Sequence, residues 1–229
     1  MSPAEGKRTR DAQRTREAIL EAAVEVFAEH GFAGARIDTI AKASGYNVSL
    51  LFQYFGDKLN LYTEVLRRAH EEATNVRARA FAPLLEQKDP FRDASQFRIF
   101  LETAIGGLFD HLVGHPRLMR ILLWEMADGW QTYARISTQM PTDKIEKFEA
   151  IFQPARQAGW LRSGFSPTVQ LMQALQTCLS YLASMPLYHA MLSEADASTV
   201  SNLAQAREYL VASVVAGIIL DAPKSNGAR

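Results

Sequence analysis

The stretch that decides the fold covers residues 31–58 and reads GFAGARIDTIAKASGYNVSLLFQYFGDK. Apolar side chains recur in it at the i, i+3 and i+4 spacings of short amphipathic helices, at Ile37, Ile40 and Ala41 and again at Leu51 and Phe55. Gly45 stands between them, where the chain must reverse and glycine adopts a left-handed backbone without a steric cost. The pattern predicts two helices, at about 37–43 and 48–55, joined by a tight turn. This is the layout of a DNA-binding helix-turn-helix, and a plain helical hairpin in a bundle has the same spacing.

Polar side chains stand where these helices are expected to begin. Asn47 is placed to cap the second helix, because its side-chain oxygen can accept a hydrogen bond from a backbone N–H of the first turn. Asp57 is placed in the same way before a further helix, with Lys58 in its first turn. We therefore expect three helices in close succession, after one longer helix.

The segment from Thr15 to Leu66 resembles the N-terminal domain of the tetracycline-repressor (TetR) family of bacterial transcriptional regulators. The resemblance is carried by the runs TREAILEAAVEVFAEHGF, IDTIAKASGYN and LLFQYFGDKLNLYTEVL. Its most specific part is the aromatic-x-Tyr-Phe-x-x-Lys run at residues 52–58, and its strong part covers about a quarter of the chain. It implies an all-α protein: an N-terminal three-helix helix-turn-helix domain that binds DNA, then a helical bundle that binds a ligand and dimerises.

The resemblance also implies which side chains contact DNA. Those that face bases are Asp38, Val48, Ser49 and Phe52, and those that contact phosphates are Arg36, Thr39, Gln53, Tyr54 and Lys58. The chain departs from the usual pattern with Leu50 in place of Thr, Phe52 in place of Tyr, and Val48 where a polar or basic residue is common. The second short helix has no Lys or Arg, which excludes bidentate readout of guanine from it. Apolar contacts of Val48 or Phe52 with thymine methyl groups remain available.

Overall charge does not identify a nucleic-acid-binding protein here, since 25 Lys and Arg residues balance 25 Asp and Glu residues. The most basic stretch is 7–16, where five Lys or Arg side chains stand against Asp11. We expect residues 1–10 to be a disordered arm, which either follows phosphates and enters a minor groove or is merely solvated. An acidic residue recurs every four positions, at Glu17, Glu21, Glu25 and Glu29. This spacing predicts a solvated helix face that points away from DNA. The DNA-binding domain is then residues 1–56.

Cysteine usage and hydropathy limit the class of protein. Cys178 is the single cysteine, which excludes an internal disulfide framework. It lies in an apolar helical pattern, so we expect a buried structural thiol, with a redox sensor as the alternative. Residues 1–30 have no signal-peptide core, and no run of eighteen apolar residues occurs. The expectation is a cytoplasmic protein with no membrane partner.

The remainder of the chain, residues 57–221, is expected to be a helical bundle, followed by a disordered tail at 222–229. Helical spacing continues through it, and Gly and Pro fall at the junctions. The predicted helices cover about 57–82, 95–113, a segment from His115-Pro116, 142–159, 166–185, and a last one from Asp196 or Ser198 to Leu220.

The segment from Ser163 to Ser193 contains no Asp, Glu, Lys or Arg. A soluble helix without charges has little free surface, which a subunit interface, an internal pocket or a deep intrachain core would explain. The resembled family forms a four-helix dimer interface from its last two long helices. The candidate interface residues are therefore Leu171, Leu175, Leu182, Leu210, Val214 and Gly217. Dimerisation matters because two recognition helices related by a two-fold axis read a palindrome.

The resemblance implies a small-molecule effector that binds the C-terminal domain and releases the operator. Large apolar side chains with few polar groups suit a hydrophobic or aromatic ligand, and the candidates are Phe97, Phe100, Trp124, Met126, Trp130, Met172 and Gln176. Such residues at helical spacing can equally be plain core. We expect Glu125 to be exposed, the alternative being a buried acid that selects a cationic ligand. The pair Gly106-Gly107 marks either close helix packing or room for a ligand.

No catalytic or cofactor motif competes with this interpretation. His111 and His115 are four residues apart, but Gly114 and Pro116 break the helix that would align them on a metal. There is no nucleophile elbow, phosphate-cradling loop or dinucleotide fingerprint, so we expect neither an enzyme nor a cofactor. The sequence predicts a homodimeric, ligand-responsive regulator of transcription, most often a repressor, that binds double-stranded operator DNA. The alternative is a DNA-bound adaptor that responds to a protein partner.

Overall fold

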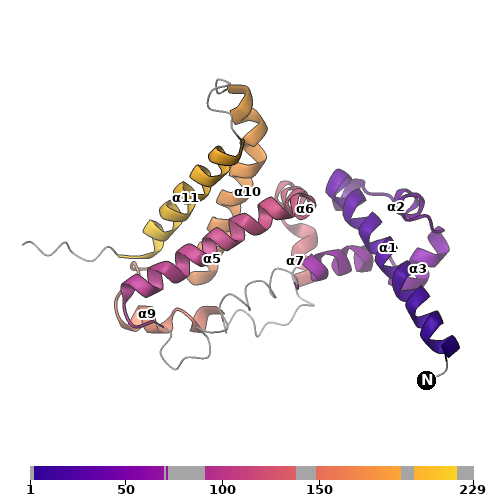
Figure 1. Ribbon diagram of the computed structural model, residues 1–229, viewed down its shortest axis with the longest axis horizontal. Coiled ribbons are helices and arrows are strands. Elements are labelled where there is room, and N and C mark those ends of the chain that lie inside the picture. The colour runs from indigo at the N-terminus through magenta and orange to yellow at the C-terminus, as the bar shows by residue number, and fades with distance from the viewer. Residues whose placement is uncertain (1–2, 70, 72–90, 138–147, 192–198, 221–229) are drawn as a thin grey trace, which may run out of the picture. The chain divides into compact units, whose positions relative to one another are not determined.

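The regular structure of the described part of the chain is α-helical nearly throughout (Figure 1). The computed structural model describes residues 3–69, 71, 91–137, 148–191 and 199–220. Within these residues the sole β-type pairing is an isolated antiparallel bridge between Leu161 and Ile219. The chain divides into two compact units, which we call the head unit (1–75 with 115–140) and the second unit (76–114 with 141–229).

The head unit contains the expected helix-turn-helix. Its helices are α1 (Pro3–Gly34), α2 (Ile37–Ser44), α3 (Val48–Phe55), a helix over residues 58–69, α6 (Pro116–Ala127) and α7 (Gln131–Ser137). In Figure 1, α2 and α3 lie beside α1. The expected DNA-binding domain of residues 1–56 lies wholly inside this unit. The head unit is larger than this predicted domain because α6 packs along α1.

The turn between α2 and α3 has the predicted chemistry. Gly45 adopts a left-handed backbone with φ of 76°, and the N–H of Tyr46 donates to the carbonyl of Ala41 across it. The side chain of Asn47 accepts from the N–H of Leu50 at 2.8 Å, which caps α3. The carboxylate of Asp57 accepts from the N–H of Asn60 at 2.7 Å and caps the next helix. The two short helices and their caps are confirmed.

One hydrophobic core holds the head unit together. Its largest fully buried side chains are Tyr62, Phe27, Ile19, Leu20, Ile40, Leu51, Leu61, Ile121 and Ile136. The ring of Tyr62 meets Phe27 edge-on with centroids 4.8 Å apart and lies 5.0 Å from the ring of Phe32. Because the core draws on α1, α2, α3, the 58–69 helix, α6 and α7, each of these helices buries its apolar face against the others.

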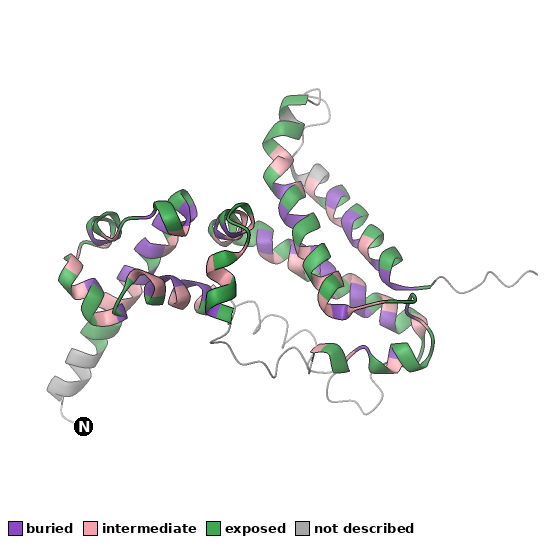
Figure 2. Ribbon diagram, turned by 180° about the vertical axis from the view of Figure 1, so that it is seen from behind, coloured by how far each residue is buried: buried purple, intermediate pink, exposed green. Residues whose placement is uncertain are grey.

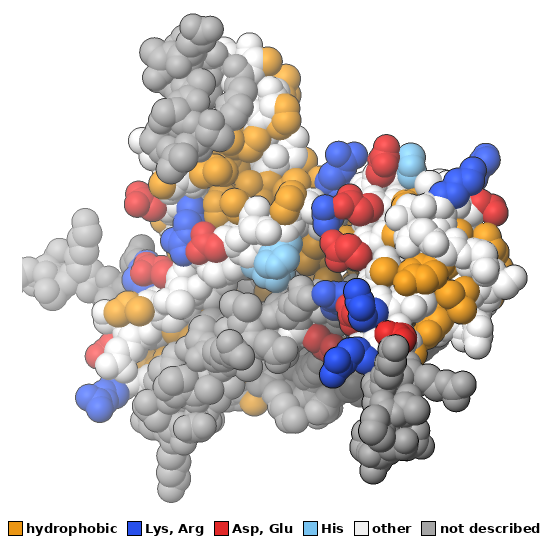
Figure 3. Space-filling model, turned by 45° about the vertical axis from the view of Figure 1, so that its right-hand side comes forward, with side chains coloured by type: hydrophobic (Ala, Val, Ile, Leu, Met, Phe, Trp, Pro, Cys, Tyr) orange, Lys and Arg blue, Asp and Glu red, His pale blue; other side chains and the backbone are white. Residues whose placement is uncertain are grey.

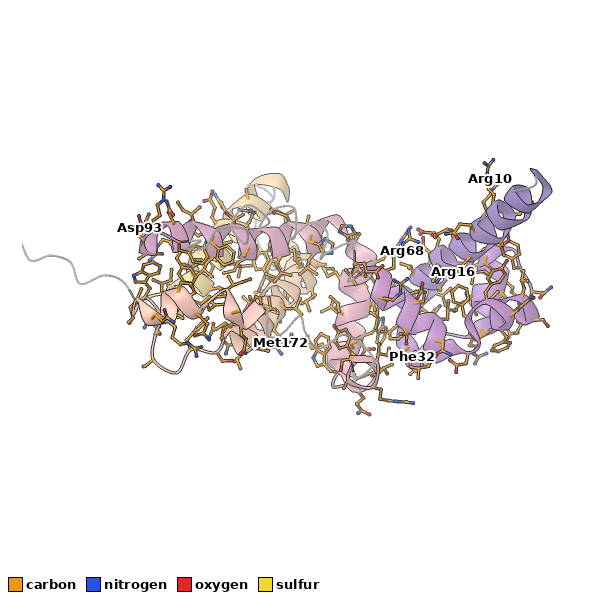
Figure 4. The ribbon with its side chains drawn as sticks, turned by 90° about the horizontal axis from the view of Figure 1, so that it is seen from below. Arg10, Arg16, Phe32, Arg68, Asp93 and Met172 are labelled. Carbon is orange, nitrogen blue, oxygen red and sulfur yellow. The ribbon has the colours of Figure 1, made fainter. Side chains whose placement is uncertain are left out.

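The predicted disordered arm over residues 1–10 differs from the structure from Pro3 onward, because α1 begins there. Proline is tolerated at the start of a helix, and the residues that follow are mostly Ala, Glu, Lys, Arg and Gln, which favour helix. A helix anchored at the buried Ile19 extends toward its N-terminus one hydrogen bond at a time, without a new nucleation step. Figure 4 shows Arg10 projecting from this extension.

The second unit contains α5 (Ala94–Gly114), α9 (Gln153–Gln157), α10 (Pro167–Met191) and α11 (Thr199–Ile218). An aromatic cluster forms its core, with Phe91, Phe97, Phe100, Phe148, Phe152, Trp160 and Phe165 in mutual ring contact. The ring of Phe97 meets Phe152 edge-on at 5.9 Å. Arg207 of α11 donates to both carboxylate oxygens of Asp110, and its guanidinium lies where a Cβ on Gly106 would be. Gly106 therefore serves close helix packing.

Two helix boundaries deserve comparison with the sequence. α6 begins at Pro116 after His115, as predicted. α10 does not end near Pro186 but continues through it to Met191. A proline removes one backbone hydrogen bond and does not end a helix when the flanking turns keep theirs. The predicted continuation to residue 82, the helix start near 142, the cap at 196 or 198 and the tail at 222–229 lie outside the described residues.

Candidate nucleic-acid interface

The helix α3 presents one face to solvent and the other to the core. Leu51 and Phe55 are buried, whereas Ser49 and Gln53 are exposed and Phe52 keeps 45% of its surface. A phenyl ring so exposed on a short surface helix is costly in water, since apolar area left in contact with solvent forgoes the hydrophobic gain. The face is uncharged, because α3 contains no Lys, Arg, Asp or Glu.

The remaining predicted contact residues stand around that face. Arg36, Asp38 and Thr39 are exposed at the start of α2. Val48 is partly buried at the first position of α3 and packs against the head core, and Tyr54, six residues further along the same helix, does so as well. All nine predicted DNA-contact residues thus lie in the head unit between residues 36 and 58, within α2, α3 and the ends that flank them.

Lys58 is held by the end of α1. Its Nζ lies 4.7 Å from the centroid of the Phe32 ring and donates to the carbonyl of Ala33 at 3.4 Å. Burial lowers the pKa of Lys58 from its ordinary value, because a partly desolvated ammonium loses hydration. The aromatic face and the carbonyl fix this cation at one place beside the helix-turn-helix.

Ion pairs join α1 to the helix over residues 58–69. Arg16 pairs with Glu64 and also lies over the ring of Phe55 at 5.4 Å, while Arg67 reaches Glu64 at 2.6 Å. Hydrogen bonds from Arg67 and Arg16 hold the pKa of Glu64 at about 2. Arg68 donates to Glu17 at 2.7 Å, and Figure 4 shows Arg16 and Arg68 on this side of the unit.

The acidic row of α1 is solvated, as predicted, and it is also paired. Besides Glu17, the row supplies Glu21, which accepts from Arg117 of α6 at 2.8 Å, and Glu25, which pairs with the same guanidinium. These carboxylates are therefore partly neutralised by helices of their own unit.

A groove lies between α10 and α11, beside the segment from Ser163 to Ser193 that contains no charged residue. The groove has a volume of about 720 Å³ and is lined by Gln170, Gln173, Gln176, Thr177, Ser180, Tyr181, Ser184, Tyr188, Leu210, Ser213, Val214 and Gly217. Three predicted interface residues, Leu210, Val214 and Gly217, therefore line it. Leu171 and Leu175 are partly buried and Leu182 is buried.

The seven candidate ligand residues are divided between the two units. Trp124, Met126 and Trp130 belong to the head unit, and the others belong to the second unit. Phe97 and Phe100 are buried in the aromatic core, Met172 is exposed on α10, and Gln176 lines the groove. No single described unit brings the seven together, and the ligand pocket stays a prediction.

The predictions about the cysteine, a metal site and a membrane span can be compared with the described residues. Cys178 is buried, as predicted, and this burial raises the pKa of its thiol to about 11, which disfavours the reactive thiolate. Among the residues that the structure describes, no three His, Cys, Asp or Glu side chains come together as a metal site. No helix in the same residues has the length and apolar character needed to cross a bilayer.

Comparison with known families decides the identity of the chain. A family model of the bacterial regulatory proteins of the tetR family matches residues 19–65, which include α2 and α3. A model of the tetracyclin repressor-like C-terminal domain matches residues 100–214, half of the chain. The chain belongs to the TetR family. The resemblance of the segment 15–66 to the N-terminal domain of this family is confirmed.

Two curated TetR-type repressors resemble the chain in sequence. The HTH-type transcriptional repressor SCO4008 of Streptomyces coelicolor is 35% identical over 116 residues, which cover 51% of this chain and 52% of that protein. The HTH-type transcriptional repressor NicS of Pseudomonas putida is 32% identical over 120 residues, which cover 52% of each. The chain thus matches about half the length of these relatives. Both of these relatives are transcriptional repressors.

Solved structures share the fold over most of the chain. The Streptomyces coelicolor protein SCO4942 has a TM-score of 0.59 at 26% identity, covering 89% of this chain and 98% of its own. The regulator FadR of Bacillus subtilis, solved in complex with stearoyl-CoA, has a TM-score of 0.59 at 18% identity, covering 88% and 98%. The all-α architecture of a TetR-family protein is confirmed.

The prediction that Glu125 is exposed is wrong. Only 2% of its surface is accessible, and its two carboxylate oxygens accept from the hydroxyl of Tyr62 at 2.7 Å and from the N–H of Tyr133 at 2.8 Å. The neighbouring Trp124 and Met126 were the available signal, since they indicate an apolar surrounding. What the sequence did not show is that a turn after residue 127 brings the start of α7 back onto Glu125.

A second feature that sequence reasoning missed lies where α1 ends. Gly31 has φ of 67° and ψ of 179°, which interrupts the helical backbone there. The carbonyl of Ala28 instead accepts from Arg120 at 3.2 Å and from the indole N–H of Trp124 at 3.3 Å. Two side chains of α6 thereby satisfy a carbonyl near the end of α1, as a helix end requires.

Proposed function

We propose that this chain is a homodimeric repressor that reads a palindromic operator and is released from it by a small, largely hydrophobic ligand. The observation that carries the DNA-reading part is the exposed, uncharged face of α3 with Ser49, Phe52 and Gln53, set on a capped and fully packed helix-turn-helix. The two curated relatives at 35% and 32% identity are repressors, which supports this sign of regulation.

Base readout is assigned to α3 and the start of α2. Phe52 and Val48 meet thymine methyl groups, which makes the site prefer A·T pairs where they lie. Ser49 donates to or accepts from a base edge, and Asp38 accepts from a base amino group. Desolvation of the exposed Phe52 ring on binding adds a favourable apolar term that a charged helix would lack.

Phosphate contacts fix the head on the duplex. The residues assigned to phosphates are Arg36, Thr39, Gln53, Tyr54 and Lys58, and the last of these contacts the Phe32 ring and donates to the Ala33 carbonyl. Such contacts set register and supply affinity without reading sequence.

A second copy of the chain is proposed to cover α10 and α11. The face has no charged residue between Ser163 and Ser193, so two copies related by a two-fold axis meet there without repulsion between like charges. Its exposed apolar side chains include Leu187, Met191 and Tyr209. Figure 3 shows hydrophobic side chains gathered on this part of the surface.

Membership of the TetR family is the basis for proposing that a small molecule releases the protein from its operator. The FadR of Bacillus subtilis, which has the same fold, was solved with stearoyl-CoA, so a long apolar ligand is one class to test here. A ligand that binds the form incompetent for DNA weakens operator binding by the same factor by which DNA weakens ligand binding. A screen of acyl-CoA and aromatic compounds for release of a labelled operator, with thermal shift as a second readout, tests this part.

Titration of variants against a selected operator tests the assignment of contacts. Lys58→Ala and Tyr54→Phe are expected to weaken binding to every duplex alike, and Lys58→Ala lowers the slope of log K against log salt by about 0.9 for the lost phosphate contact. Ser49→Ala or Val48→Thr changes the preferred base instead, by roughly 1–3 kcal/mol at one position.

The matched control is Lys42→Ala, which removes the same charge from an exposed position of α2 outside the assigned contacts. An unchanged affinity of Lys58→Ala for all duplexes would contradict the docking proposed here.

A further inference from the structure

Glu125 is the one charged side chain that is buried in the part of the chain that the structure describes. A buried carboxylate is costly unless hydrogen bonds satisfy its oxygens. Here Oε1 accepts from the Tyr62 hydroxyl and Oε2 from the Tyr133 N–H, so each oxygen has one donor, and each donor comes from a different helix.

The turn between α6 and α7 is built around this carboxylate. Trp130 has φ of 61°, a left-handed backbone that a bulky residue adopts only when its surroundings impose it. Its N–H donates to the carbonyl of Glu125 at 2.7 Å, so the turn closes directly onto this residue. Tyr133 is the third residue of α7, where a backbone N–H has no partner within its own helix. The carboxylate therefore caps α7 and meets the positive end of its dipole.

The Tyr62 hydroxyl is the other half of the link. Burial and the adjacent Glu125 raise the pKa of Tyr62, so the phenol stays protonated and remains a donor. The ring of Tyr62 packs at 5.0 Å against the ring of Phe32, and that ring carries the Lys58 ammonium at 4.7 Å. A continuous set of contacts thus runs from the carboxylate to the proposed phosphate contact.

We infer that Glu125 is a positioning residue for DNA binding: it holds Tyr62, and through Tyr62 and Phe32 it sets where Lys58 meets the operator. The inference rests on the proposed function, since it needs Lys58 at a phosphate. It also makes the corner between α6 and α7 part of the DNA-binding machinery, although α6 begins 58 residues beyond Lys58 in the sequence. A displacement of that corner would break the hydrogen bond between Glu125 and Tyr62 and so change the position of Lys58.

Two substitutions test the link without emptying the core. Tyr62→Phe removes only the hydroxyl and keeps the ring contacts, and Glu125→Gln keeps the shape of the side chain and removes its charge. Operator affinity and its salt slope are measured at a temperature where each variant is fully folded by circular dichroism. We expect each variant to bind the operator about tenfold more weakly, the range in which mutations along a coupling route act, with a salt slope shifted toward that of Lys58→Ala.

A double-mutant cycle decides whether the route passes through Lys58. In a Lys58→Ala background, Tyr62→Phe and Glu125→Gln are expected to have no further effect on affinity, because the positioned group is gone. Ile136→Val is the matched control, since it trims a buried side chain of α7 in the same unit without touching the polar link. It should lower the melting temperature and leave affinity unchanged.

Three results would overturn the inference. If the folded Tyr62→Phe and Glu125→Gln proteins bind with wild-type affinity and slope, Glu125 serves stability alone. If they weaken binding equally with and without Lys58, the effect does not pass through Lys58. If the folded wild-type protein binds no selected duplex, the proposed function fails and this inference fails with it.

Discussion

The head unit and the helices α10 and α11 of the second unit differ in how far their large apolar side chains are exposed to solvent. In the head unit the biggest ones are inside, as Phe27 and Tyr62 show, and the exposed exceptions are Phe52 and Trp124. On α10 and α11 large side chains stay in solvent, and Met191 and Tyr209 keep 74% and 73% of their surface. Figure 2 shows buried positions on one side of these helices and exposed positions on the other. One region buries its own large apolar side chains, and the other leaves apolar surface that the proposed second copy would cover.

The largest effect is expected from a charge placed on the proposed partner face. Val214→Glu puts a carboxylate into the groove between α10 and α11, where the second copy would bury it or bring its own Glu close. The chain should become monomeric by sedimentation, and operator affinity should fall roughly 10²- to 10⁴-fold because the two heads no longer bind together.

Ser95→Glu is the control, since it adds the same charge at an exposed position near the start of α5. Val214→Glu protein that stays dimeric and folded would remove the distinction between the two regions.

Removal of a core side chain from the head is the next largest effect. Phe27→Ala should lower the free energy of unfolding by about 3–5 kcal/mol, the range for deleting a buried aromatic ring. Leu187→Ser, at an exposed position of α10, should change the stability of the isolated chain by less than about 0.5 kcal/mol. Chemical denaturation at a concentration below the dimer dissociation constant measures both. Equal losses would mean that α10 is as completely packed as the head.

Substitution of two glycines in the head unit separates the cost of a steric clash from the cost of backbone strain. Gly31 and Gly45 both have positive φ, but a Cβ on Gly31 would lie 3.0 Å from the Trp124 ring, while nothing lies within 4 Å of one on Gly45. Gly45→Ala should therefore cost about 1–2 kcal/mol of stability for the left-handed backbone alone. Gly31→Ala should cost about 3 kcal/mol, because its φ and ψ suit glycine only and the indole must also move. Thermal unfolding of both variants gives the difference, and equal costs would place the Trp124 contact in doubt.

The smallest expected effect is the pH dependence of the stability that Glu64 contributes. Arg67 and Arg16 hold the pKa of Glu64 at about 2, below its ordinary 4.5, so the pairing stabilises the head fully above pH 4.5 and is lost as pH falls toward 2. Glu64→Gln should cost about 1–2 kcal/mol at pH 7, a figure reduced for the half-exposed Arg67, and the two stability curves should converge near pH 2. Parallel curves across this range would show that the ion pairs contribute nothing measurable.

The helix-turn-helix was predictable because its signals are local. Gly45, Asn47 and Asp57 each act within four residues of their own position, and the apolar spacing of α2 and α3 needs no distant partner. The boundaries found for α3 match those predicted, and those for α2 differ by one residue. The DNA-contact residues came from the family resemblance of this segment and stay a prediction.

What sequence reasoning missed depends on segments far apart in the chain. The burial of Glu125 is decided by Tyr62, which lies 63 residues away, and by a left-handed Trp130 that no propensity favours. The end of α1 is satisfied by Trp124, 96 residues from Ala28. Such long-range pairings leave no periodic trace in the sequence, because each partner alone looks like an ordinary helix residue.

The central claim is that each chain supplies one complete reading head and that two chains are needed to read a site. Selection from a random duplex library, followed by mass measurement of the complex with the selected duplex, tests it most directly. The account predicts a palindromic sequence with A·T pairs beneath Phe52 and Val48, occupied by two chains or by four as a pair of dimers. A single asymmetric site occupied by one chain, or no enrichment from folded and dimeric protein, would contradict it.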